Sequence, residues 1–131
     1  MRNYISELDE KFVCDLVSAF LTKNWHAKNI TVKKHGPCWK VNYKINDGYN
    51  VFLLDNFTAN FGTNHMWCSA LDKVWQAALY CKFGEEYYLD LNKYLIEQSK
   101  SKNKDQQERA MGELKAIKAI KEKEDLKNTR Q

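Results

Sequence analysis

The chain has 131 residues, with 21 Lys and Arg against 17 Asp and Glu, and 44% of its residues are hydrophobic. This length suits one modest globular domain and excludes two full-size ones. No apolar run approaches the roughly 18 residues of a membrane-spanning helix, and the acidic opening lacks the pattern of a secretory signal. We therefore expect a cytoplasmic protein with reduced cysteines and no membrane partner.

The formal net charge of +4 is unevenly distributed along the chain. Residues 1–98 carry eleven basic and eleven acidic side chains, whereas residues 99–131 carry ten basic and six acidic ones and hold the whole surplus. Within the neutral part, residues 16–46 contain six lysines and no carboxylate. This pattern predicts a compact domain over residues 1–98, followed by a basic linker and a C-terminal helix or tail over residues 99–131.

The first half of the chain predicts a helix followed by a sheet. Ser6 and Asp9 have the spacing of a capping box, and the apolar residues that follow recur at helical spacing, which predicts a helix over residues 4–23. Residues 30–54 alternate apolar and polar side chains between turn signals, which predicts a three-stranded antiparallel meander. A polar loop is expected over residues 55–65.

The middle strand shows the alternation most clearly, because every second residue is apolar. This predicts one buried sheet face and one solvated face. The buried face is expected to carry Trp39, Val41, Tyr43 and Ile45, and the solvated face Lys40, Asn42 and Lys44.

The second half predicts two packing helices and a C-terminal basic helix, so the fold class is α+β. The first helix is expected to bury one stripe, made of Trp67, Leu71, Val74, Ala78 and Cys81, and to end at Gly84. A tyrosine-bearing helical segment follows. Cys14 and Cys81 are interpreted as core residues.

The C-terminal segment carries a narrow apolar stripe surrounded by charge. Its members are spaced by three residues: Met111, Leu114, Ile117 and Ile120. Such a helix is only marginally stable alone, so it needs a partner, which is the sheet, a second copy of the chain in a homo-oligomer, or a target protein. A solvated, partly disordered tail is the alternative.

One predicted surface, rich in lysine and bearing exposed aromatics, points to binding. Four lysines on the predicted hairpin, with two aromatics expected to be exposed, form a candidate interaction surface: Lys33, Lys34, Lys40, Lys44, Trp25 and Tyr49. Such a surface suits a phosphate backbone, although lysines on a solvated strand also discourage edge pairing. The chain has three arginines against 18 lysines, which argues against base-specific readout.

One motif raises the question of a metal. Two His-x-x-Cys pairs, His35 with Cys38 and His65 with Cys68, would together offer four ligands to a tetrahedral zinc ion. The alternative is that these residues have no metal role, because a cysteine is often simply a small buried apolar residue. No cofactor is otherwise expected.

The order helix, three antiparallel strands, helix, with Gly36-Pro37 at the first turn and Ala77-Ala78 in the later helix, resembles the double-stranded-RNA-binding domain over residues 4–83. That resemblance implies an RNA-binding turn and a lysine cluster at the start of the last helix. In this sequence the helix opens with Ser69-Ala70-Leu71-Asp72-Lys73, so an acid stands where that family places its phosphate contacts.

The same order is also similar to small α-β-β-β-α sandwich proteins encoded by phages, on the basis of Cys38-Trp39-Lys40-Val41 and residues 70–79. Richness in lysine and asparagine, short length and a charged tail fit phage accessory proteins. This resemblance implies a protein that binds and inhibits a host defence component, as an anti-CRISPR does, in the host cytoplasm.

The carboxylates are scattered, and none pairs with a histidine or another acid at a spacing typical of acid-base catalysis, so we expect no enzyme. The leading hypothesis is a non-enzymatic binding or inhibitor protein directed at a host protein or ribonucleoprotein. The alternatives are a protein that contacts the backbone of RNA or DNA through the lysine-rich hairpin, and a sponge for a small signalling nucleotide.

Overall fold

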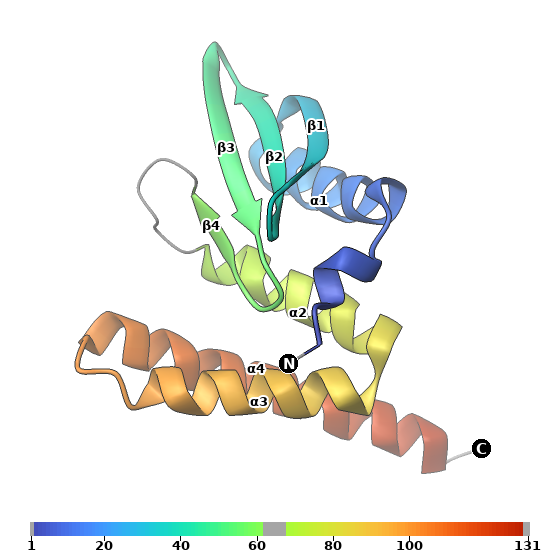
Figure 1. Ribbon diagram of the computed structural model, residues 1–131, viewed down its shortest axis with the longest axis vertical. Helices are drawn as coiled ribbons and strands as arrows, with labels where there is room; N and C mark the ends of the chain where they lie inside the picture. The colour runs from blue at the N-terminus through green and yellow to red at the C-terminus, as the bar shows by residue number, and fades with distance from the viewer. Residues whose placement is uncertain (1, 62–67, 130–131) are drawn as a thin grey trace. The chain divides into compact units, whose positions relative to one another are not determined.

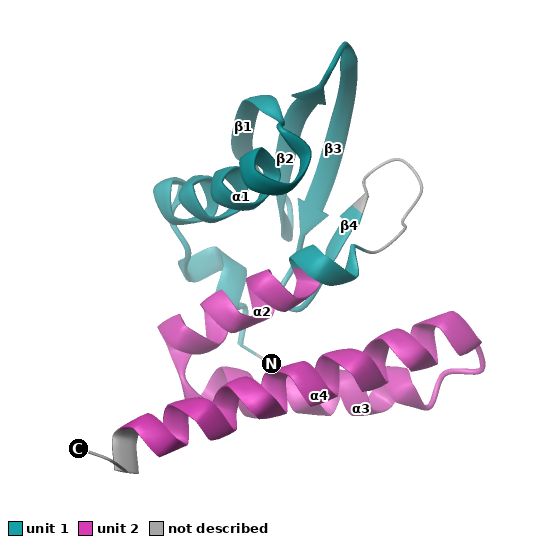
Figure 2. Ribbon diagram, turned by 180° about the vertical axis from the view of Figure 1, so that it is seen from behind, with its two compact units in different colours: residues 1–71 teal, residues 72–131 magenta. Residues whose placement is uncertain are grey.

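The computed structural model describes residues 2–61 and 68–129, and it confirms the α+β class (Figure 1). An N-terminal helical region is followed by an antiparallel sheet and then by three helices. The chain divides into two compact units, residues 1–71 and 72–131, which Figure 2 shows in different colours.

The helix expected over residues 4–23 is two elements in the structure. A short 3-10 helix, η1, covers Tyr4–Glu7, and α1 covers Glu10–Trp25. The cap of α1 is Asp9, whose Oδ1 accepts a hydrogen bond of 2.7 Å from the backbone N–H of Phe12. The capping box expected from Ser6 is therefore wrong: an Asp in this position satisfies a first-turn donor by itself, and the helix begins after it.

The sheet has four antiparallel strands in the order β1-β2-β3-β4, one more than expected. The strands are β1 (Lys28–His35), β2 (Cys38–Ile45), β3 (Gly48–Leu54) and β4 (Ala59–Phe61). The fourth strand lies in the segment expected to be a polar loop.

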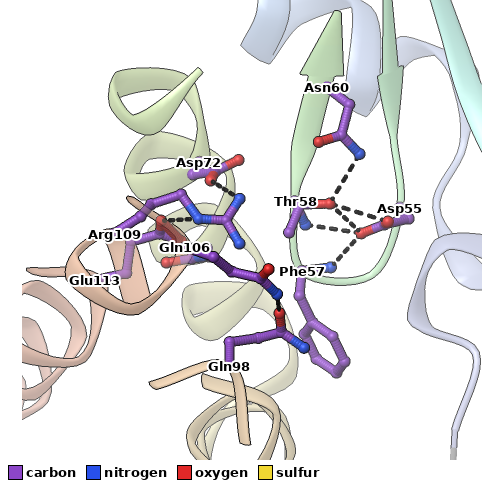
Figure 3. Close-up of polar contacts among 10 residues, drawn as sticks. Asp55, Phe57, Thr58, Asn60, Asp72, Gln98, Gln106, Arg109 and Glu113 are labelled. Atoms are coloured by element: carbon purple, nitrogen blue, oxygen red, sulfur yellow. Dashed lines mark hydrogen bonds and ion pairs between the residues drawn. The ribbon is translucent and has the colours of Figure 1, made fainter. Parts of the chain in front are cut away.

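A tight turn after β3 explains this fourth strand (Figure 3). The Asp55 Oδ1 atom accepts hydrogen bonds from the backbone N–H groups of Phe57 and Thr58, at 2.9 and 2.7 Å. The backbone N–H of Asp55 also donates to the carbonyl of Thr58. An aspartate that bonds to the backbone two and three residues ahead mimics a turn, which reverses the chain and allows β4 to pair with β3.

The alternation expected for β2 is confirmed over most of the strand. Trp39, Val41 and Tyr43 are buried, while Lys40, Asn42 and Lys44 on the other face are half-buried. Ile45, expected on the buried face, is only half-buried because it is the last residue of the strand. Helix α1 contributes Val13, Val17 and Leu21 to the core of this unit, at the i, i+4 spacing of one helix face. The expected solvated face therefore points away from the side of the sheet that carries the core.

The second unit is built from residues 72–83 of α2 (Ser69–Phe83), together with α3 (Glu85–Ser99) and α4 (Lys104–Thr129). Only Gly84 separates α2 from α3, and its φ of 76° lies in the left-handed region, where glycine avoids a steric penalty. The next two helices, α3 and α4, form an antiparallel hairpin. Lys121 pairs with Glu85 at one end of it, and Gln106 bonds to Gln98 at the other. In the described part of the chain, no helix combines the length and apolar character that a bilayer span requires.

The C-terminal segment thus has a partner within its own unit. Ala110 and Ile117 of α4 are buried, as are Tyr87, Leu91 and Leu95 of α3. The boundary expected at residue 98 falls between these two packed helices.

The buried stripe of α2 differs from the expected one. Leu71, Trp75 and Leu79 are fully buried, whereas Val74 is 36% exposed and Cys81 is exposed. Cys14, also expected in the core, is half-buried, and Trp67 lies outside the described residues. The helix is turned so that its largest apolar side chains, and with them Asp72 and Gln76, face inward.

Asp72 and Gln76 form a buried polar cluster with two residues of α4. Figure 3 shows three of its members, Asp72, Arg109 and Glu113. Arg109 Nη1 lies 3.8 Å from Asp72 Oδ2, and Arg109 Nε lies 3.6 Å from Glu113 Oε2. The amide of Gln76 donates to Glu113 Oε1 at 2.7 Å. One guanidinium therefore lies against two carboxylates in the interior of this unit.

Burial raises the pKa of Glu113 above its ordinary value, while Gln76 and Arg109 act in the opposite direction. Desolvation is the larger effect, because a charged carboxylate loses its hydration in the interior. The cluster thus resists carrying two full negative charges.

Replacement of Arg109 is expected to destabilise the protein strongly. Arg109→Ala leaves two buried carboxylates without their counter-charge, a loss of about 3–5 kcal/mol in the free energy of unfolding. Chemical denaturation measures this loss. As a control, Lys11→Ala breaks the exposed pair with Asp15 and should leave stability nearly unchanged. Equal stability of the two variants would contradict an energetic role for the cluster.

The pH dependence of the free energy of unfolding should reveal the raised pKa of Glu113. The unfolded carboxyl ionises near 4.5, whereas the folded one keeps its proton to higher pH. Its contribution to stability is therefore present below about pH 4.5 and is lost as pH rises through the folded pKa. We expect Glu113→Gln to gain stability relative to the wild type as pH rises from about 4 to 7. Glu7→Gln is the control of opposite sign, because Arg2 lowers the pKa of Glu7. Parallel curves for Glu113→Gln and the wild type would contradict the shift.

Candidate binding face of the sheet

The lysines of the hairpin lie opposite one another on one face of the sheet. In the β1-β2 register, Lys33 pairs with Lys40 and Lys28 pairs with Lys44. Directly opposed residues in an antiparallel pair share a face, with their Cβ atoms about 5 Å apart. We call the four side chains Lys28, Lys33, Lys40 and Lys44 the lysine face.

A bulge places Lys28 in this group. Two residues of β1, Asn29 and Ile30, stand opposite the single residue Tyr43 of β2, and Asn29 has a φ of 55°. Lys28 was not among the expected surface residues, because a bulge cannot be recognised from alternation alone. An asparagine at this point is the available signal, since its side chain tolerates the left-handed conformation.

The lysine face carries an energetic cost that its structural role does not explain. Like charges directly opposite each other destabilise a sheet. Lysines on an edge strand discourage edge-to-edge pairing, which explains those of β1. Strand β2, however, is paired on both sides, and none of the four strands contains an Asp or a Glu. This uncompensated face is the strongest sign of a functional surface.

Strand β3 adds an apolar row beside the lysines. Tyr49 pairs with Lys44, Val51 with Asn42, and Leu53 with Lys40. Tyr49 is 82% exposed, as expected, and the Lys44 Nζ atom lies 5.4 Å from the centre of its ring. The face therefore combines positive charge with aromatic and aliphatic surface.

Lys34 lies on the opposite face, apart from the other lysines. It pairs with Trp39, and its Nζ atom lies 5.6 Å from the Trp39 ring centre and 3.4 Å from the carbonyl oxygen of Ser6. The Trp39 indole in turn donates to the carbonyl of Ile5. Lys34 thus helps to fasten the N-terminal segment to the sheet.

Trp25 is not the exposed aromatic that was expected. It is half-buried and stacks on Tyr43 and Phe52 at ring-centroid distances of 6.3 and 5.7 Å, with Phe20 edge-on to it. Burial also raises the pKa of Tyr43 to about 12. As the last residue of α1, Trp25 extends the core to the end of the sheet.

The two His-x-x-Cys pairs are only partly described. His35 and Cys38 are register partners across the first turn, and burial raises the pKa of the Cys38 thiol, which disfavours the thiolate form. The backbone N–H of Cys68 donates to Ala59, while His65 lies outside the described residues. Within residues 2–61 and 68–129, no three His, Cys, Asp or Glu side chains cluster in a way that could hold a metal ion. The complete four-ligand site stays a prediction.

The four residues of the C-terminal stripe have different environments. Ile117 is fully buried, Leu114 and Ile120 are half-buried, and Met111 is 56% exposed. Position around α4 decides this: Ile117 belongs to the buried side of the helix, whereas Met111 belongs to an exposed side.

Comparison of the chain with protein-family models, with characterised proteins and with solved structures gave no match.

The two lysine pairs predict an unusual response to mutation. Lys33→Thr removes the repulsion of Lys40 and introduces a good strand former, so we expect it to raise the free energy of unfolding by about 0.2–1 kcal/mol. Lys34→Thr is the matched control, because the same change one residue later loses the contacts with Trp39 and Ser6. A destabilised Lys33→Thr variant would show that the lysine pairs support the fold.

Proposed function

We propose that this chain is a non-enzymatic binding protein that attaches to an acidic surface of a partner protein through the lysine face of its sheet. The observation that carries the proposal is the pair of like-charge contacts, Lys33 with Lys40 and Lys28 with Lys44, on a sheet that has no carboxylate in its strands. An acidic partner removes the repulsion on binding, so electrostatic complementarity provides both attraction and selectivity.

The apolar row on β3 supports a protein partner in particular. Tyr49, Val51 and Leu53 lie beside the lysines, and such a mixture is typical of interfaces, in which an apolar patch is bordered by polar groups. An exposed tyrosine brings a large contact area with little loss of side-chain entropy. Tyr49 is therefore the side chain we assign to the centre of the contact.

We further propose that the partner is a host defence component, such as a CRISPR effector, and that binding inhibits it. This finer proposal is supported by the resemblance of the helix-strand-helix order, short length and lysine-rich composition to phage-encoded accessory proteins.

A second candidate is a protein that binds the backbone of RNA or DNA. The stacking of Lys44 on the exposed ring of Tyr49 favours it, because an aromatic platform beside lysines is typical of single-strand binding surfaces. Such binding would be strongly weakened by salt, since it depends on counterion release.

Capture from a bacterial lysate distinguishes these proposals. We expect the immobilised wild type to retain a protein that Lys33→Glu/Lys40→Glu loses and that nuclease treatment does not remove. A control of equal charge change, Lys23→Glu/Lys102→Glu, alters exposed lysines outside the face and should retain it. Identification of the captured protein as part of a defence complex supports the finer proposal.

Three other outcomes would count against the leading proposal. Release by nuclease would favour the nucleic-acid candidate, and a steep loss of binding to a single-stranded oligonucleotide between about 50 and 200 mM salt would confirm it. Equal retention by both charge variants would exclude the lysine face as the contact. Failure of the wild type to retain any protein would leave the proposed partner without support.

A further inference from the structure

The hairpin of α3 and α4 carries an apolar groove that is separate from the lysine face. Its volume is about 450 Å³, and the residues that line it include Tyr88 and Asn92 of α3 and Met111, Leu114, Lys115 and Lys118 of α4. All of these belong to the second unit. The groove therefore lies wholly within that unit.

The groove lies on the side of α4 away from α2. Arg109 contacts Asp72 of α2, and Met111 follows two residues later. At about 100° per residue, these side chains point about 200° apart around the helix. The α4 side chains that line the groove are thus on the side of this helix opposite Arg109, while on α3 the Tyr88 ring packs edge-on against Tyr80 of α2.

The surface around the groove is unusually apolar for an exposed one. Met111 is 56% exposed, and on α3 Leu89 and Ile96 are 58% and 47% exposed. Leu89 and Ile96 are seven residues apart, and so lie on one side of their helix. Exposed apolar side chains beside an apolar groove favour an interaction site.

The charges of the residues that line the groove indicate which kind of partner it binds. Its charged lining residues, Lys115 and Lys118, are both positive, and its lining contains no carboxylate. On the opposite side of α4, helix α2 places the carboxylate of Asp72 against the guanidinium of Arg109. A second copy of the chain fits poorly, because a two-fold interface brings the same patch together and would set these lysines against each other.

We propose that this groove binds an amphipathic α-helix of a partner protein, with its apolar stripe on Met111 and Leu114 and its carboxylates against Lys115 and Lys118. A helix seated between two antiparallel helices completes a bundle, which is the usual mode of helix-in-groove recognition. The groove is distinct from the lysine face, so this proposal stands or falls independently of the proposed function.

A pair of designed peptides tests the proposal. The probe is a labelled helical peptide of about 20 residues with leucine at i, i+4 and i+7 and glutamate on both flanks, and the comparison peptide has lysine in place of glutamate. We expect fluorescence anisotropy to show binding of the glutamate peptide alone. Met111→Glu and Lys115→Glu/Lys118→Glu should each weaken it at least about tenfold, and the double variant should gain affinity for the lysine peptide.

Lys123→Glu is the control on the same helix, because residue 123 points away from the groove, and it should bind as the wild type does. Circular dichroism verifies that each variant keeps its helices. Equal affinity of the wild type for the two peptides, or unchanged binding by Met111→Glu, would overturn the proposal. A wild-type dimer in analytical ultracentrifugation that Met111→Glu dissociates would overturn it in favour of self-association.

Discussion

The second unit depends on one buried cation. Arg109 lies between Asp72 of α2 and Glu113 of its own helix, and Gln76 completes the group by donating to Glu113. Because charges are costly to bury unless they are paired, this group fixes how α2 is turned and against which part of α4 it packs. The position of the α3-α4 groove on the opposite side follows from the same constraint.

Charge is used in the opposite way on the sheet. In the second unit, one cation lies against two carboxylates in the interior, so that unlike charges are in contact. On the lysine face, like charges are placed opposite each other at the surface, and no carboxylate of the strands offsets them. The first arrangement supports a fold, and the second opposes it. This contrast is why the sheet, rather than the buried cluster, is the better candidate for contact with another molecule.

The elements that follow from local pattern could be predicted from the sequence. Strict alternation identified Trp39, Val41 and Tyr43 as the buried side of β2, and apolar spacing predicted the main helices, although α1 begins at Glu10 and not at residue 4. The predictions were wrong where contacts between distant parts of the chain decide the position of a side chain. Lys34 is drawn to Trp39 and to the Ser6 carbonyl, Trp25 is covered by ring partners as distant as Phe52, and the rotation of α2 depends on a hydrogen bond across 37 positions in the chain. Of the candidate site, the sequence supplied the lysines and Tyr49, but not the bulge that adds Lys28.

Because Asn29 lies in the bulge, its left-handed conformation also determines the register in which β1 pairs with β2. Side chains of a strand alternate between faces, so a change of one position in pairing moves every residue on that side of it to the other face. If a substitution at Asn29 straightened the strand, Lys28 would leave its place opposite Lys44 although no charged residue had changed. The electrostatic pattern of this surface can therefore evolve through an uncharged side chain.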